Sequence, residues 1–175
     1  EARRWLLLGF CVWFYASWSI GFLGLLFANI TIDYLIALRL GPETRPRVRT
    51  ALVTASVSMN LGMLGFFKYL GFAAKVADDT LTLLGTGWRV PVPHLILPLG
   101  ISFFVFQKIS YLLDLRRGDR HIYPFLDFCL FVTFFPQLIA GPLVRHNEII
   151  FQFDRNPRGP AMWENLSRGA VLFTI

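Results

Sequence analysis

The sequence has few charged residues, and this shortage limits what the protein can be. Only 16% of its 175 residues are Asp, Glu, Lys or Arg, whereas ordinary soluble domains contain about a quarter. Hydrophobic residues make up 55% of the chain, and 18 residues are Phe. One soluble core cannot bury that much apolar surface, so the composition indicates a membrane protein.

Cysteine and the common catalytic motifs are also scarce. Cys11 and Cys129 are the two cysteines, and both lie inside apolar segments. Neither has metal-ligand spacing, and a disulfide is not expected at that depth in a membrane. We interpret His94, His121 and His146 as ordinary loop or interface residues, because none has metal-ligand spacing. The sequence has no Gly-rich phosphate loop, no G-x-S-x-G elbow and no H-E-x-x-H motif. It therefore predicts no bound metal or cofactor and shows no catalytic constellation.

The net charge is +6, and the arginines are concentrated in short loops between apolar runs. That distribution is typical of cytoplasmic loops that orient a membrane protein, and we prefer it to nucleic-acid binding. The chain begins at Glu1 and ends at Ile175 inside a new apolar run. We therefore expect a single partial transmembrane domain, truncated at both ends.

The predicted fold is all-α, a polytopic integral membrane protein with broken or re-entrant helices. A crossing helix needs about 20 apolar residues, and five apolar segments are expected at 5–19, 22–38, 50–70, 95–115 and 125–144. In the third segment small residues recur every three or four positions and predict a face for close helix contact. This face comprises Ala51, Ala55, Ser58 and Gly62. A weak apolar run at 81–84 is expected to lie on the membrane surface or to form a short helical turn.

Two acceptable explanations remain for the polar residues Asn29 and Asp33 of the second segment. They lie four residues apart on one helical face, so they fit either interhelical hydrogen bonds or the wall of a cavity. We prefer the first.

The last two segments are interrupted by proline and glycine at 98–100 and 136–142. Proline removes a backbone donor and clashes with the preceding turn. We therefore expect the helix of segment 95–115 to begin near Leu99 and the helix of segment 125–144 to be broken at Pro136. Backbone that unwinds inside a membrane must be lined by protein or water. If segment 125–144 crossed the membrane, the arginines after residue 144 would lie on its outer side. The positive-inside rule therefore favours a re-entrant segment that returns to the cytoplasmic side.

A polar seam follows one face of the helix after Gly100. Gln107, Ser110 and Asp114 are separated by three or four residues, and the seam leads toward a basic turn at Arg116, Arg117 and Arg120. We interpret this seam as the lining of a cavity.

Three stretches of the sequence resemble the membrane-bound O-acyltransferase family. They are FFKYLGF at 66–72, LPLGISFFVFQKISYLLDLRRG at 97–118 and FLDFCLFVTFFPQLIAGPLVR at 125–145. The resemblance is closest to the bacterial branch that includes the alginate O-acetyltransferase membrane subunit and the D-alanyl transfer protein of teichoic acid synthesis. Val105 and Lys108 depart from the pattern, because smaller polar residues are expected there.

The resemblance implies a partial form of that family's membrane core and an O-acyltransferase activity. An acyl group, acetyl in particular, would pass from a cytoplasmic acyl-CoA or acyl carrier protein thioester to a hydroxyl of a cell-envelope polysaccharide. The implied location is the bacterial inner membrane, with multiple crossings. A periplasmic or extracellular acyl-transfer protein is a further implied partner, and no nucleic acid is expected.

The family's catalytic histidine lies in a Trp-His block that this sequence does not contain, so we assign no catalytic residue and expect the fragment alone to be inactive. The residues expected to line a substrate tunnel are Gln107, Ser110, Asp114, Gln137, Gly141, Pro142 and Arg145. The basic turn of Arg116, Arg117 and Arg120 could attract the phosphates of a coenzyme A donor, although a role in orientation explains it better.

Two other functions fit broken membrane helices. A transporter or flippase uses them as well, but it predicts an inverted repeat, and no second copy of either broken segment is found. A non-catalytic membrane scaffold for a secreted modifying enzyme is the other alternative.

Overall fold

The computed structural model describes residues 2–41, 44–119, 121–140, 144–153, 159 and 162–174. All regular structure within these residues is helical, which confirms the predicted all-α class. The elements in chain order are α1 (Ala2–Trp18), α2 (Ile20–Arg39), α3 (Pro46–Leu83), α4 (Ile101–Arg117), α5 (Phe125–Thr133), α6 (Phe135–Ala140), α7 (His146–Ile149), the 3₁₀ helix η1 (Ile150–Phe153) and α8 (Met162–Thr174).

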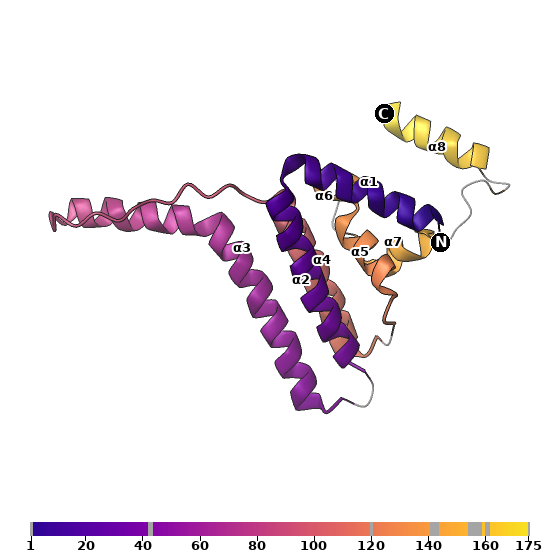
Figure 1. Ribbon diagram of the computed structural model, residues 1–175, viewed down its shortest axis with the longest axis horizontal. Helices are drawn as coiled ribbons and strands as arrows, with labels where there is room; N and C mark the ends of the chain where they lie inside the picture. The colour runs from indigo at the N-terminus through magenta and orange to yellow at the C-terminus, as the bar shows by residue number, and fades with distance from the viewer. Residues whose placement is uncertain are drawn as a thin grey trace.

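The helices α2 and α4 and the first part of α3 lie side by side, while α1 forms a V with α2 and packs against α5 (Figure 1). Of the described helices, α2 and α3 are long and apolar enough to cross a membrane. The predicted boundary between the first two apolar segments is confirmed at Ser19. This residue is extended, and its hydroxyl oxygen accepts the N–H of Phe22 at 3.4 Å, which caps α2.

The third helix differs from the prediction in length and in its buried face. It continues unbroken to Leu83, so the run at 81–84 is the end of α3 rather than a separate surface turn. The predicted contact face of small residues is exposed, so it is not buried against the described helices and stays a prediction. The buried face instead carries Val53, Ser56, Asn60 and Leu64. A polar cluster decides this orientation, because Ser56 and Asn60 both bind a buried carboxylate on α2.

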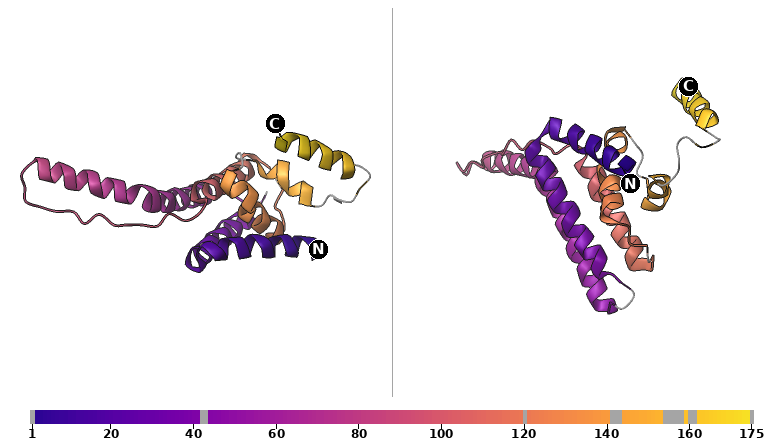
Figure 2. Two further views of the ribbon diagram at one scale, coloured as in Figure 1. Left: turned by 90° about the horizontal axis from the view of Figure 1, so that it is seen from above. Right: turned by 45° about the vertical axis from the view of Figure 1, so that its right-hand side comes forward.

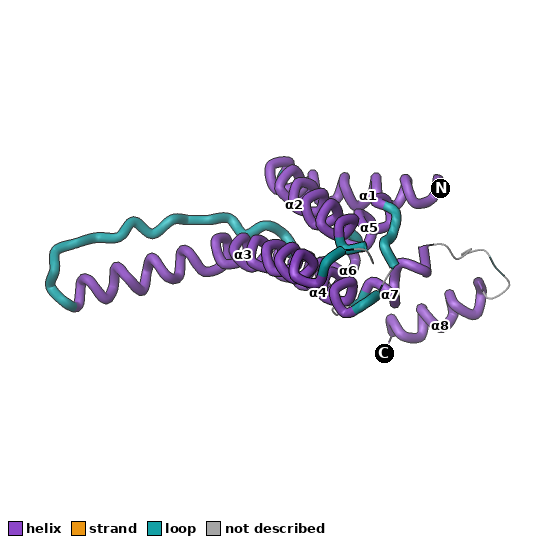
Figure 3. Tube along the Cα trace, turned by 90° about the horizontal axis from the view of Figure 1, so that it is seen from below, coloured by secondary structure: helices purple, strands orange, loops and turns teal. Residues whose placement is uncertain are grey.

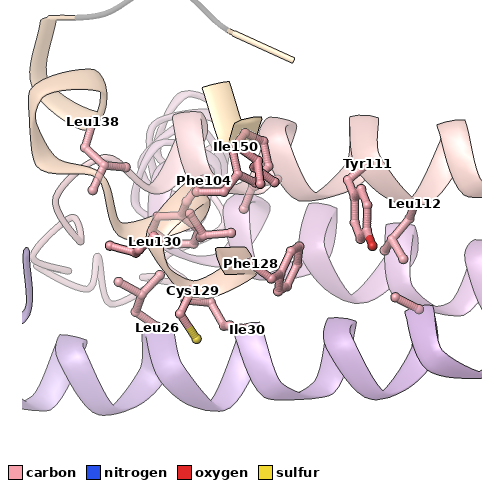
Figure 4. Packing of buried hydrophobic residues seen from close by; sticks show 14 of the residues in the cluster. Leu26, Ile30, Phe104, Tyr111, Leu112, Phe128, Cys129, Leu130, Leu138 and Ile150 are labelled. Atoms are coloured by element: carbon pink, nitrogen blue, oxygen red, sulfur yellow. The ribbon is translucent and has the colours of Figure 1, made fainter. Parts of the chain in front are cut away.

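The apolar core lies between α2, α4 and α5 (Figure 4). Leu26 and Ile30 of α2 face Phe128 and Cys129 of α5, and Phe104 of α4 lies behind them. Cys11 and Cys129 are both buried and unbridged, as expected for packing residues. Because α5 is only nine residues long, or about 14 Å at 1.5 Å per residue, it cannot cross a bilayer alone.

Both predicted interruptions are present, each displaced slightly from the expected residue. Helix α4 begins at Ile101 rather than near Leu99, because Gly100 has a left-handed φ of +67°. Helix α5 ends at Thr133, Phe134 is extended, and Pro136 lies in the first turn of α6. Proline is well tolerated in a first turn and restricts the residue before it. The break therefore precedes Pro136.

Candidate functional site

The two interrupted segments contact each other at their breaks. A Cβ atom placed on Gly100 would lie 3.0 Å from Leu138 Cδ2 and 3.3 Å from the Leu138 carbonyl oxygen. Only glycine combines the left-handed backbone with such a close approach. The unwound backbone is also capped from α1, because the Tyr15 hydroxyl donates to the Leu99 carbonyl oxygen at 2.9 Å. The prediction that unwound backbone finds protein partners holds here.

The chain enters and leaves the fifth apolar segment at the same end. Tyr123 lies just before α5, and His146 is the first residue of α7, yet the Tyr123 hydroxyl lies 3.1 Å from His146 Nδ1. His146 Nε2 also lies 3.4 Å from Asp114 Oδ2, near the end of α4. A segment that crossed the bilayer would separate these residues by roughly 30 Å. This geometry supports the re-entrant interpretation.

His146, which the sequence predicts to be an ordinary loop histidine, is at the centre of this cluster. Its side chain is 1% exposed, with the Tyr111 ring centroid at 5.1 Å. Nε2 faces Asp114 and, at 3.7 Å, Asp119. Two carboxylates beside Nε2 favour the tautomer that carries its proton there, with Nδ1 accepting from Tyr123. No spacing in the sequence indicates this cluster.

Burial raises the pKa of the Tyr123 phenol, and the nearby Asp119 carboxylate raises it further. The phenol therefore stays protonated at neutral pH and can serve as the donor to His146. Tyr123 also borders a pocket of about 410 Å³ with Arg4, His121, Asp127 and Asn147. Arg4 Nη1 pairs with Asp127 Oδ2 at 3.2 Å in this pocket.

The predicted tunnel residues occupy different environments. Gln107 and Gln137 are buried, at 2% and 5% exposure, and Gln107 Oε1 has no hydrogen-bond partner in the described part of the chain. Ser110 and Asp114 are half-buried, and Arg145 is exposed. Gly141 and Pro142 lie outside the described residues. Tunnel lining therefore stays a prediction.

The predicted basic turn is represented by Arg116 and Arg117, since Arg120 lies outside the described residues. Both described side chains are exposed. Arg117 Nη1 lies 3.6 Å from Asp114 Oδ1. Asp114, the last residue of the polar seam, thus forms an ion pair with an arginine of the basic turn.

A second buried polar cluster joins α2, α3 and α4. Lys108 Nζ lies 3.0 Å from Asp33 Oδ2, and both side chains are fully buried. This contact is an ion pair whose alignment falls outside hydrogen-bond geometry. Ser56 donates to Asp33 Oδ1, and Asn60 Nδ2 donates to both carboxylate oxygens at 3.1 and 2.9 Å. The preferred interpretation of Asp33 as a source of interhelical bonds is confirmed.

The cation of Lys108, a position where the resemblance predicts a smaller polar residue, is matched by Asp33 in this cluster. Among the residues that the structure describes, no group of three or more His, Cys, Asp or Glu side chains could hold a metal ion.

Comparison with known proteins gives a consistent set of relatives. The chain is similar to a probable alginate O-acetylase of Azotobacter vinelandii, with 42% identity over 157 residues that cover 87% of this chain and 31% of that protein. It is similar to a peptidoglycan O-acetyltransferase of Helicobacter pylori, with 34% identity over 201 aligned positions that cover 99% of the chain and 36% of the relative. A teichoic acid D-alanyltransferase of Lacticaseibacillus rhamnosus matches at 32% identity over 62 residues, covering 34% of the chain and 15% of that protein.

No family model and no solved structure matches the chain. These relatives are named as acyl-transfer proteins, and their matches confirm the resemblance to the membrane-bound O-acyltransferases that was found in the sequence. The chain spans about a third of the length of the alginate O-acetylase and of the peptidoglycan O-acetyltransferase. Together with the two apolar helices, these relatives indicate a membrane protein.

Proposed function

We propose that this chain is part of a multi-pass O-acyltransferase of the bacterial inner membrane. The enzyme moves an acetyl or similar acyl group from a cytoplasmic thioester to a hydroxyl of a cell-envelope polysaccharide. The observation that carries the proposal is the 42% identity to a probable alginate O-acetylase over 87% of the chain. The peptidoglycan O-acetyltransferase that matches almost the whole chain supports the same class of acceptor.

The re-entrant segment gives this proposal a physical basis. The contacts of His146 with Tyr123 and Asp114 support a segment that returns to the end at which it entered, and such a segment can close a cavity from one side without crossing the bilayer. Gln107, with its buried and unpaired Oε1 in the described part of the chain, supplies a polar group on the helix beside this segment. Such a group suits the lining of a tunnel for a polar substrate.

The donor and the partners follow from the same proposal. Acyl-CoA or an acyl carrier protein would supply the thioester on the side of the basic turn, where Arg116 and Arg117 are exposed. A general base in the remaining part of the enzyme would remove the proton from the acceptor hydroxyl. An acyl-transfer protein outside the cytoplasm would be the partner where the acceptor lies far from the membrane.

The test uses the full-length protein in sealed inside-out vesicles. Radiolabelled acetyl-CoA and a carrier protein loaded with radiolabelled acetyl are supplied in separate reactions, and alkali-labile label on the polysaccharide is measured. We expect label with at least one donor, and we expect its loss when the histidine of the family's Trp-His block is changed to Ala.

A matched pair of variants tests the part played by this chain. Gln107→Leu, which removes a buried polar group, should lower transfer, whereas Thr54→Ala on the exposed side of α3 should not. Equal acyl transfer by the wild type and by the variant without the histidine of the Trp-His block would overturn the proposal that the protein is an acyltransferase. Movement of unmodified substrate across the vesicle membrane would favour a transporter instead.

A further inference from the structure

The pocket that Tyr123 borders has the size and the mixed lining of a ligand site. Its volume is about 410 Å³, and small-molecule sites typically measure about 300–1,000 Å³. Ile150 and Phe151 of η1 supply apolar surface. The polar side chains come from α1, α5, α7 and the residues just before α5, and they are Arg4, Tyr123, Asp127 and Asn147. These helices lie on the side of the molecule away from the outer part of α3 (Figures 1, 2 and 3).

The charged groups of this pocket neutralise each other. Arg4 Nη1 lies 3.2 Å from Asp127 Oδ2, and the Asp127 side chain is only 6% exposed. A phosphate or carboxylate group in the pocket would compete with Asp127 for the guanidinium group and would meet a like charge beside it. The pocket therefore suits a neutral ligand. Asp127 Oδ1, which is buried without a hydrogen-bond partner in the described part of the chain, retains the capacity to accept a hydrogen bond.

The hydroxyl group of Tyr123 presents an acceptor to the pocket. It lies 3.1 Å from His146 Nδ1, while His146 Nε2 faces Asp114 Oδ2 at 3.4 Å and Asp119 Oδ2 at 3.7 Å. Because the two carboxylates hold the imidazole proton on Nε2, Nδ1 accepts the proton of the phenol. The phenol oxygen then has lone pairs for a ligand but no hydrogen to donate to it.

These features together select a neutral ligand that donates hydrogen bonds and also carries apolar groups. The pantetheine arm of an acyl thioester has this chemistry, since amide N–H groups and a hydroxyl group alternate along it with methyl and methylene groups. Acyl-CoA and acyl carrier protein share this arm, whereas their phosphate groups are anionic and do not match the pocket. The position agrees as well, because Tyr123 follows the basic turn in the connection between α4 and α5.

We propose that this pocket binds the pantetheine arm of the acyl donor. Tyr123 and Asp127 accept hydrogen bonds from the amide or hydroxyl groups of the arm, and His146 fixes the direction of the Tyr123 hydroxyl. Tyr123 is then a specificity-determining residue for the donor, and His146 is a positioning residue that acts through it. This inference rests on the proposed acyl-transfer function, because that function identifies the donor.

Acyl transfer by the full-length protein in sealed inside-out vesicles tests the proposal with donors that differ in the arm. Acetyl-CoA, a carrier protein loaded with acetyl and S-acetylpantetheine all carry the arm, whereas S-ethyl thioacetate lacks it. Tyr123→Phe preserves the ring and removes the acceptor oxygen. Its matched control is Tyr69→Phe, at an exposed position on α3. KM and kcat are measured for each donor with both variants and the wild type.

We expect Tyr123→Phe to raise KM about five-fold for the donors that carry the arm, as the loss of one hydrogen bond predicts. Its kcat should change little, and its kcat/KM for S-ethyl thioacetate should equal that of the wild type. Tyr69→Phe should match the wild type with every donor. His146→Ala should raise KM for the same donors, and the double variant with Tyr123→Phe should show no further rise, because both changes remove one acceptor.

Equal losses in Tyr123→Phe with and without the arm, or no loss with any donor, would overturn this inference and leave the acyltransferase intact. A rise in KM confined to acetyl-CoA or to the carrier protein would assign the pocket to the nucleotide or to the carrier surface, which also overturns it. If the wild type transferred acetyl from no donor, the proposed function would fail and this inference with it.

Discussion

Lys108 Nζ lies 3.0 Å from Asp33 Oδ2, and neither side chain is reached by solvent. The pair links the middle of α4 to the second half of α2, and Asn60 and Ser56 attach α3 to the same carboxylate. The buried carboxylate of Asp33 therefore holds three helices in one register. A buried charge that loses its partner is costly, whereas a neutral replacement of both partners is often tolerated.

We predict that Asp33→Asn and Lys108→Met each destabilise the full-length protein by about 3–5 kcal/mol, the cost of leaving one buried charge unpaired. The double variant Asp33→Asn/Lys108→Met should recover most of that loss. Denaturant unfolding in detergent micelles measures all three. Additive losses in the double variant would show that the two side chains do not act as a pair.

Gly100→Ala should destabilise the protein more than Gly85→Ala. Both glycines have nearly the same left-handed φ, +67° and +65°, but only Gly100 has atoms of Leu138 in the space of the added methyl group. A left-handed alanine costs about 1–2 kcal/mol, and overpacking adds about 1–3 kcal/mol at Gly100. Thermal unfolding of the two variants measures the difference. Equal effects would mean that the two breaks are not in contact.

Tyr15→Phe should cost about 1 kcal/mol, because it leaves the part-buried Leu99 carbonyl oxygen without its donor while preserving the ring. Tyr69→Phe is the control, since Tyr69 is exposed on α3 and should change stability little. Unfolding in detergent compares the two. If Tyr15→Phe were no less stable than Tyr69→Phe, the carbonyl group of Leu99 would have to be hydrogen-bonded in another way.

The re-entrant path of segment 125–144 predicts that its two flanks label from one side of a sealed vesicle. Asp119→Cys and Glu148→Cys, both at exposed positions, should react with a membrane-impermeant maleimide from the same side. Thr86→Cys, just after the end of α3 at Leu83, should react from the other side. Labelling of positions 119 and 148 from opposite sides would mean that the segment crosses the bilayer.

The Tyr123–His146 contact should respond to pH on the alkaline side. Burial raises the pKa of Tyr123 in the folded protein, so folding favours the protonated phenol, and stability should fall as pH rises above the ordinary tyrosine range. Tyr123→Phe should remove part of that alkaline loss. Unfolding measured from pH 7 to 11 tests this, and an unchanged alkaline slope in Tyr123→Phe would contradict it.

The sequence determined the features that depend on local chemistry. Its apolar content predicted a membrane protein, and the boundary at Ser19 and the interruptions at Gly100 and before Pro136 could be predicted because glycine, proline and capping residues act on their immediate neighbours. The family resemblance followed from continuous blocks of residues. The exposed small-residue face of α3 could not be predicted, since its orientation depends on what the other helices offer.

Only the tertiary structure decided which polar groups meet. Tyr15 and Leu99 are 84 positions apart in the chain, and Tyr123 and His146 are 23 apart, so no spacing rule connects them. The same holds for the pairing of Lys108 with Asp33, which turned an unexpected lysine into a structural link. Buried hydrogen bonds and ion pairs depend on the full path of the chain, because each partner is brought into place by elements distant in sequence.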